Sequence, residues 1–140
     1  MMTINATDAR NEWGAVVDSA IHEKPKFIQR TRDCLMLSDV KLVEELLSAY
    51  TFSANVFHEA DGSVTLSLNE LDLVENGVDL DAASIKLAEE ILGYAEDYYS
   101  DFAYWAAGQR KAHIPYVIKS LIINDARKIG GLIQCQPGKS

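Results

Sequence analysis

The sequence predicts an α+β protein built in two parts. Residues 1–50 form a strand–helix–hairpin–helix module, and residues 51–140 form a β-hairpin followed by two long helices. Two observations predict this class. Short runs of alternating apolar residues flank polar turns, as in half-buried strands, while apolar residues at three- and four-residue spacing indicate helices in both parts. With 140 residues, 48% of them hydrophobic and 24% charged, the chain is long enough to bury a core and has the composition of an ordered protein.

The first helix is predicted from its cap and its apolar stripe. A short strand at Met2–Asn5 leads into it, Asn5 is a favourable N-cap residue, and Asp8 follows in the capping-box position. Pro25 ends it, because the residue before a proline avoids the α region. The residues at helical spacing that are expected to face the core are Ala9, Trp13, Val16, Val17, Ala20 and Ile21.

A hairpin and a second helix follow in this module. Two short strands, Lys26–Gln29 and Cys34–Leu37, are joined by the tight polar turn Arg30–Asp33. Ser38 is expected to cap a helix that extends to Ala49. The residues expected on its inward face are Val40, Val43, Leu46 and Leu47.

Three segments carry a resemblance to a known family. They are Ile4-Asn5-Ala6-Thr7-Asp8-Ala9-Arg10, then Ile28-Gln29-Arg30, and then Leu35-Met36-Leu37-Ser38 before an acidic helix. In this order they resemble the N-terminal domain of the Phd/YefM antitoxins of bacterial toxin–antitoxin operons, over roughly the first third of the chain. Many members have an Arg-Gly-Lys turn, whereas this chain has Arg30-Thr31-Arg32-Asp33, which keeps the positive charge without the glycine.

The resemblance implies a homodimer that pairs through the sheet and second helix and presents its arginines to a palindromic operator DNA. A guanidinium suits phosphate oxygens or a guanine edge. From residue type alone, a surface arginine paired with an acid is the favoured interpretation of Arg10, and the family position reverses that preference. For Arg30 and Arg32, a solvated turn and a phosphate contact are equally favoured. The residues expected to contact DNA are Arg10, Arg30, Arg32, Thr7, Asn11 and Lys26, with Lys24 in the same patch.

The second part begins with a hairpin. A strand is predicted in Tyr50–Glu59, and Asp61-Gly62 is a strong hairpin turn signal. The second arm alternates apolar and polar residues from Val64 to Leu68, as a half-buried strand does. Asn69–Gly77 is expected to be a polar loop in which Gly77 takes a positive φ.

Two long helices are predicted next. Asp79 or Asp81 caps the first, which extends to Trp105 and breaks near Gly108. Pro115 suits the first turn of the last helix, which ends at Gly130-Gly131, and Gln134–Ser140 is expected to be frayed. The order of strand, glycine loop and acid-capped helix in residues 61–98 is also weakly similar to the HicB-like antitoxin fold.

Charge is distributed unevenly along the chain. The net charge is −8, which excludes a uniformly basic nucleic-acid binder. Residues 1–50 carry a net −2, residues 51–101 a net −11 with Lys86 as their one base, and residues 102–140 a net +5. This asymmetry indicates either pairing between the last two segments or a basic partner for the middle one.

Aromatic residues gather around the end of the first long helix. Packing against the last helix accounts for them, but they exceed what one stripe needs, and Tyr and Trp are enriched at interface hot spots. Under the antitoxin hypothesis this acidic, aromatic region binds a cognate toxin. The residues expected to bind the partner are Tyr94, Tyr98, Tyr99, Phe102 and Trp105, with Tyr104 in the same cluster.

No catalytic, metal or cofactor site is predicted. His22, His58 and His113 lack the spacing of metal ligands, and there is no phosphate loop or dinucleotide fingerprint. Cys34 is expected to be a small core residue, and Cys135 lies in the tail. With no signal pattern and no apolar run of membrane-spanning length, a reduced, cytoplasmic protein that does not enter the membrane is expected.

Three functions follow in order of preference. The first is a DNA-binding antitoxin that neutralises a toxin and represses its own operon. The second is an interaction protein that keeps the dimer module but does not bind DNA. The third is a small hydrolase or nuclease, which the missing catalytic constellation disfavours.

Overall fold

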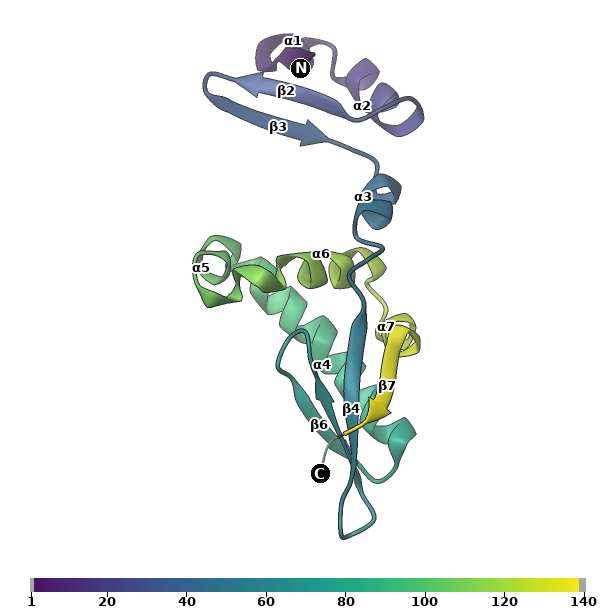
Figure 1. Cartoon of the computed structure of the whole chain (residues 1–140). Coiled ribbons are helices and arrows are strands. Elements are labelled where there is room, and N and C mark those ends of the chain that lie inside the picture. Colours follow the sequence, from purple (N-terminus) through teal and green to yellow (C-terminus); the bar gives the residue numbers. More distant parts are fainter. Residues whose placement is uncertain (1, 139–140) are drawn as a thin grey trace. The chain divides into compact units, whose positions relative to one another are not determined.

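The computed structural model describes residues 2–138, in two compact units divided between Leu46 and Leu47. The division falls slightly before the boundary at residue 50 that the sequence indicated. Each unit contains its own sheet and its own helices, so the mixed α+β architecture predicted from the sequence is confirmed (Figure 1).

The first unit is a three-stranded sheet with helices. Its strand order is β1-β2-β3, with β1 parallel and β3 antiparallel to β2. Ile4, Ile28 and Leu35 lie in register across the three strands. Its elements are β1 (Thr3–Asn5), α1 (Ala6–Asn11), α2 (Trp13–His22), β2 (Lys26–Arg30), β3 (Asp33–Leu37) and α3 (Val40–Leu46).

Local signals explain the beginning of this unit. The Asn5 side chain accepts a hydrogen bond of 2.8 Å from the Thr7 backbone N–H, which confirms it as the N-cap. The predicted turn forms with Thr31 in the left-handed region at φ 53°, a costly conformation for a β-branched residue. The core is small: Ala9, Val16 and Ile28 form its buried cluster, and Ala20 is also buried.

Two predictions for the first helix are wrong. The helix is broken at Glu12, where φ is −117° and ψ is 33°, so α1 and α2 are separate helices. The break lets both short helices pack on β2. Trp13 and Ile21 were expected in the core but are 51% and 50% exposed.

Further corrections concern the hairpin and the third helix. Cys34 is exposed rather than buried, and it lies on the edge strand β3, which pairs with a neighbour on one side only. Asp39, not Ser38, caps α3, since its carboxylate accepts the Lys41 backbone N–H at 3.0 Å. α3 buries none of its residues, and Val40 and Leu46 are 52% and 61% exposed.

The second unit is a four-stranded sheet covered by helices on one face (Figure 1). The strand order is β6-β5-β4-β7, antiparallel except that β7 runs parallel to β4. Its elements are β4 (Phe52–His58), β5 (Val64–Leu68), β6 (Val74–Gly77), α4 (Leu80–Ser100), α5 (Phe102–Ala106), the 3-10 helix η1 (Gln109–His113), α6 (Ile114–Ile123), α7 (Ala126–Leu132) and β7 (Ile133–Pro137).

The hairpin and the helix caps of this unit agree with the sequence. Gly62 takes φ 88° in the turn between β4 and β5, and Asp79 caps α4 through a 2.8 Å bond to the Ala82 backbone N–H. The alternation in β5 is confirmed, because Val64, Leu66 and Leu68 are all buried. Phe52, Ala54, Leu66, Leu87, Ile91 and Ile129 are among the fully buried residues that join the sheet to α4 and α7.

Two segments predicted as irregular are strands. The expected loop Asn69–Gly77 contains β6, and the expected frayed tail contains all of β7 except its first residue, with residues 139 and 140 outside the described part of the chain. Both are edge strands, whose pairing depends on β5 and β4 rather than on their own pattern. Gly77 does not have the expected positive φ; a Cβ there would collide with the backbone of Ala82 and Ala83, so glycine permits close packing of β6 on α4.

The two predicted long helices are each interrupted. α4 ends at Asp101, with φ −137° and ψ 54°, and the change of direction lets Trp105 stack on Tyr98 with ring centroids 6.1 Å apart. In one continuous helix, residues seven apart would be separated by about 10 Å along the axis. The last helix starts with Pro115 in its first turn, as predicted, but ends at Asn124 in the left-handed conformation before α7 begins.

Candidate functional site

Three arginines of the first unit lie on two neighbouring parts of it, the helix α1 and the hairpin of β2 and β3. Arg10 comes from α1, Arg30 ends β2, and Arg32 stands in the turn that follows; all three are exposed. Arg10 and Arg30 line one shared groove, although 20 positions separate them in the sequence. The structure therefore brings together two of the arginines that the sequence analysis assigned to DNA.

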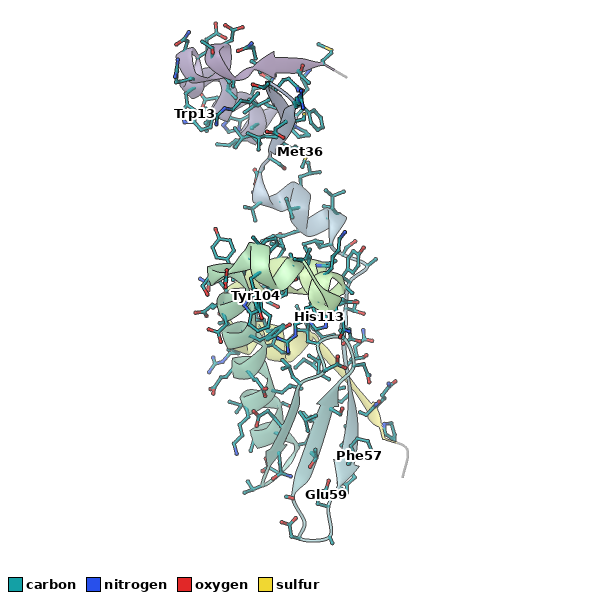
Figure 2. The ribbon with its side chains drawn as sticks, turned by 90° about the vertical axis from the view of Figure 1, so that its left-hand side faces the viewer. Trp13, Met36, Phe57, Glu59, Tyr104 and His113 are labelled. Atoms are coloured by element: carbon teal, nitrogen blue, oxygen red, sulfur yellow. The ribbon has the colours of Figure 1, made fainter. Side chains whose placement is uncertain are left out.

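The floor of this arginine groove is apolar. The groove has a volume of about 690 Å³ and lies between α1 and the strands β2 and β3. Trp13, Leu35 and Met36 line it and are 51%, 57% and 47% exposed. Figure 2 labels Trp13 and Met36 on the first unit. The full lining is Ala6, Ala9, Arg10, Trp13, Ile28, Arg30, Leu35, Met36 and Leu37. Trp13 was expected in the core from its helical spacing, and the sequence pattern did not indicate this groove.

The other residues predicted to contact DNA occupy different positions. Thr7 and Asn11 are exposed on α1 with Arg10. Lys24 and Lys26 line a separate hollow with Met2 and Pro25. Lys26 begins β2 and Arg30 ends it, so the two lie about 13 Å apart along the strand. The lysines thus form a second basic position rather than part of the arginine groove.

The aromatic cluster of the second unit is largely internal. Tyr98 is 1% exposed and packs against Phe102 and Trp105, with centroids 5.5 and 6.1 Å away. Its hydroxyl donates a 2.7 Å hydrogen bond to the backbone carbonyl of Arg110. The Arg110 guanidinium lies 4.5 Å from the centroid of the Trp105 ring, a cation–π contact. These contacts hold the end of α4, α5 and η1 together.

A tyrosine–histidine pair completes this end of the unit. The Tyr94 hydroxyl lies 2.7 Å from Nδ1 of His113. Burial lowers the pKa of His113 and raises the pKa of Tyr94, so both stay neutral near neutral pH. Tyr99 and Tyr104, by contrast, are 64% and 71% exposed. Figure 2 labels Tyr104 and His113 at the same end of the second unit. Of the aromatic residues considered, these two tyrosines offer the most surface to a partner.

Two carboxyl groups meet where β6 packs on α4. The Oε2 atom of Glu90 is buried and has no hydrogen-bond partner among the described residues, and Glu75 lies beside it. Burial first, and then the Glu75 carboxylate, raise the pKa of Glu90 from 4.5 to about 7. The residue pattern of α4 gave no indication of this pair.

Other kinds of site are not found in the described residues. Within residues 2–138, no three His, Cys, Asp or Glu side chains are grouped so that they could hold a metal ion. No helix in that part of the chain is both long and apolar enough to cross a membrane.

Comparison with known proteins gives a consistent result. A family model described as PHD_like, an antitoxin of RelE/RelB toxin–antitoxin systems, matches residues 1–135. A crystal structure described as an antitoxin part of a proposed toxin/antitoxin system from Syntrophomonas wolfei subsp. wolfei is similar, with a TM-score of 0.92 and 32% sequence identity. The similarity covers 99% of this chain and 100% of that one. No curated protein sequence matches significantly.

Proposed function

The chain belongs to the PHD_like family of antitoxins, and we propose from this that it neutralises a toxin by direct binding and represses its own operon in the cytoplasm. We assign DNA binding to a homodimer of the first unit, as in the Phd/YefM type, and toxin binding to the second unit. The observation that carries this division is the arginine groove, where charge and exposed apolar surface coincide.

A second copy accounts for the exposed apolar surface of the first unit. Trp13, Leu35 and Met36 are each about half exposed around one groove, while the unit itself buries few large side chains. Apolar surface of this kind is removed from water when two copies associate. Two-fold symmetry would then present Arg10, Arg30 and Arg32 twice, which suits a palindromic operator.

Positive charge supports DNA binding despite the net charge of −8. Arg10, Arg30 and Arg32 are all exposed in the single chain and belong to neighbouring elements of the first unit. Because phosphate contacts release counterions, each arginine that contacts a phosphate should contribute close to one unit of salt dependence per protomer. The acidic segment that would repel DNA belongs to the second unit, which is assigned to the toxin.

A mobility-shift titration tests the DNA-binding half of the proposal. The probe is DNA from upstream of the gene, titrated at two salt concentrations against an unrelated fragment of equal length. Arg30→Ala and Arg32→Ala should weaken binding to both fragments and flatten the salt dependence, whereas Arg10→Ala should cost roughly 1–3 kcal/mol more on the operator if it reads a base edge. Lys41→Ala, an exposed cation of α3, is the matched control.

Two results would change the proposal. Unchanged operator affinity in the triple arginine variant would remove DNA binding and leave the alternative, an interaction protein that uses the same dimer. The net charge of −8, which repels DNA, would then agree with a protein that does not bind an operator. Loss of toxin binding in the triple variant would contradict the assignment of the toxin to the second unit.

A further inference from the structure

A groove runs between α4 and α7 on the second unit. It has a volume of about 500 Å³, and its apolar lining comes from Ile85, Ala88, Ala126 and Gly130. A Cβ added to Gly130 would lie 3.4 Å from the Ala88 Cβ, so small residues allow the two helices to approach closely. The groove is therefore a consequence of tight helix packing beneath it rather than of a missing side chain.

Ile85 stands exposed at this groove. Its side chain is 61% exposed, although the residues on the opposite face of α4, including Leu87 and Ile91, are completely buried. Asp81 and Glu89 lie one turn before and one turn after Ile85, so they occupy the same face of the helix and also line the groove. An apolar side chain is thus placed between two exposed carboxylates.

A glycine lies one turn further along the same face of α4. Gly93 follows Glu89 by four residues in the interior of α4, where glycine destabilises a helix relative to alanine. Gly93 is exposed, and apart from its own helix no described residue lies within 4 Å of the position of an added Cβ. Packing within this unit therefore does not require glycine here, whereas close approach by another molecule would.

We propose that this α4–α7 groove is where the toxin docks, an inference that rests on the proposed antitoxin function. Its occupant is a toxin segment, an amphipathic helix with an apolar side chain that contacts Ile85 and with Lys or Arg side chains that pair with Asp81 and Glu89. Charge complementarity selects this chemistry, because the segment that contains α4 carries a net charge of −11. Arg127 on the opposite wall restricts the toxin's basic side chains to the α4 side and so fixes the orientation of the helix.

The test uses the full-length protein and the purified product of the adjacent toxin gene, with binding measured by calorimetry at two salt concentrations. Ile85→Ala should weaken binding at least tenfold by removing the apolar anchor. The double variant Asp81→Lys and Glu89→Lys should also weaken binding at least tenfold and should flatten its salt dependence. All three side chains are exposed, so the variants should keep the fold, which circular dichroism checks.

Two control variants lie elsewhere on the same unit. Val78→Ala truncates a side chain that is 81% exposed and outside the groove, and Glu96→Lys reverses an exposed charge on α4 outside the groove. Each should change toxin affinity by less than about threefold, because scattered surface residues away from an interface contribute little. A Tyr99→Ala and Tyr104→Ala double variant reports on the aromatic end of the unit.

The outcomes are distinguishable. If the unmodified protein does not bind the toxin, both the proposed function and the docking inference are wrong. If it binds and the groove variants match the controls, only the docking inference is wrong, and loss of binding in the double tyrosine variant would move the site to the aromatic end. If Ile85→Ala instead lowers the mass of the protein alone, a second copy occupies the groove and the inference is overturned.

Discussion

The two units differ in how far each can stabilise itself. Among residues 2–138, the first unit buries four apolar side chains, Ala9, Val16, Ala20 and Ile28, and the second buries fourteen, including Phe52, Tyr98 and several leucines. The first unit has 46 residues, which is near the size at which a fold commonly needs metals, disulfides or oligomerisation to be stable. This difference indicates that the first unit needs its exposed apolar groove covered in order to be stable. The α4–α7 groove, by contrast, lies on a unit that already buries a core of its own.

The largest expected effect comes from the arginine groove. Leu35→Asp places a charge on the apolar surface that the second copy is proposed to cover, so the dimer should dissociate. Sedimentation of the unmodified protein should give twice the 15.5 kDa mass of the chain, and the variant should give the single mass. Its first unit should also lose its protection against amide exchange.

An exposed leucine of the second unit is the matched control for this variant. Leu132 is 47% exposed, close to the 57% of Leu35, and it belongs to the self-sufficient unit. Leu132→Asp should leave the dimer intact. A monomeric unmodified protein, or equal effects from both variants, would contradict the dependence of the first unit on a second copy.

The next effect is a loss of stability confined to the second unit. Ile91 is fully buried between α4 and the sheet, and Ile91→Ala should lower the free energy of unfolding of that unit by about 2–5 kcal/mol. Urea unfolding followed by the exchange of individual amides should show a lower midpoint for this unit and an unchanged dimer. Simultaneous loss of both units would show that they unfold as one, against the comparison.

A smaller, pH-dependent effect is expected from Glu90. Its pKa is raised from 4.5 in the unfolded chain to about 7 in the folded one, so the folded protein holds the proton more tightly. The free energy of unfolding should therefore fall as pH rises from about 4.5 to about 7 and then level off. Glu90→Gln should remove this fall and stabilise the protein above pH 7 by on the order of 1–2 kcal/mol, after allowance for solvent screening, with little change below pH 4.5.

The control for this titration is Glu96→Gln, an exposed carboxyl on the same helix. It should leave the pH dependence unchanged. Thermal unfolding measured from pH 4 to pH 8 provides the comparison, and a Glu90→Gln variant with the pH profile of the unmodified protein would refute the raised pKa of Glu90.

The smallest expected effects come from the helix caps. Asn5 caps α1 in the first unit and Asp79 caps α4 in the second, each through a 2.8 Å bond to a backbone N–H. Replacement of either by alanine should cost about 1 kcal/mol. Because the first unit is less stable, Asn5→Ala should raise the concentration at which the dimer dissociates, whereas Asp79→Ala should not. The midpoint of dissociation, measured by sedimentation, distinguishes the two.

Sequence reasoning predicted features that depend on local chemistry. The caps Asn5 and Asp79, the Gly62 turn and the alternation of β5 are each determined by a few neighbouring residues. It failed for β6 and β7, because the pairing of an edge strand depends on a neighbour far away in the sequence. It also failed for the burial of Trp13, because helical spacing shows that a face is apolar but not which molecule covers it.

The candidate sites, like the fold, could be predicted from the sequence only in part. The residue types and the resemblance of the first module indicated Arg10 and Arg30, but only the fold shows that they share a groove with Leu35 and Met36. The separation of Lys26 from Arg30 could have been inferred from the length of the strand between them. Helical spacing places Ile85 and Ile91 on different faces of α4, but the spacing alone does not show which of the two faces the rest of the unit covers.

The central claim is that the first unit depends on a second copy and the second unit does not. Amide exchange of the full-length protein over a dilution series tests it most directly, with Ile28 reporting on the first unit and Ile91 on the second. Protection at Ile28 should fall as the dimer is diluted, while protection at Ile91 stays constant. Protection at Ile28 that does not change over a dilution in which the measured mass falls to that of a single chain would contradict the claim.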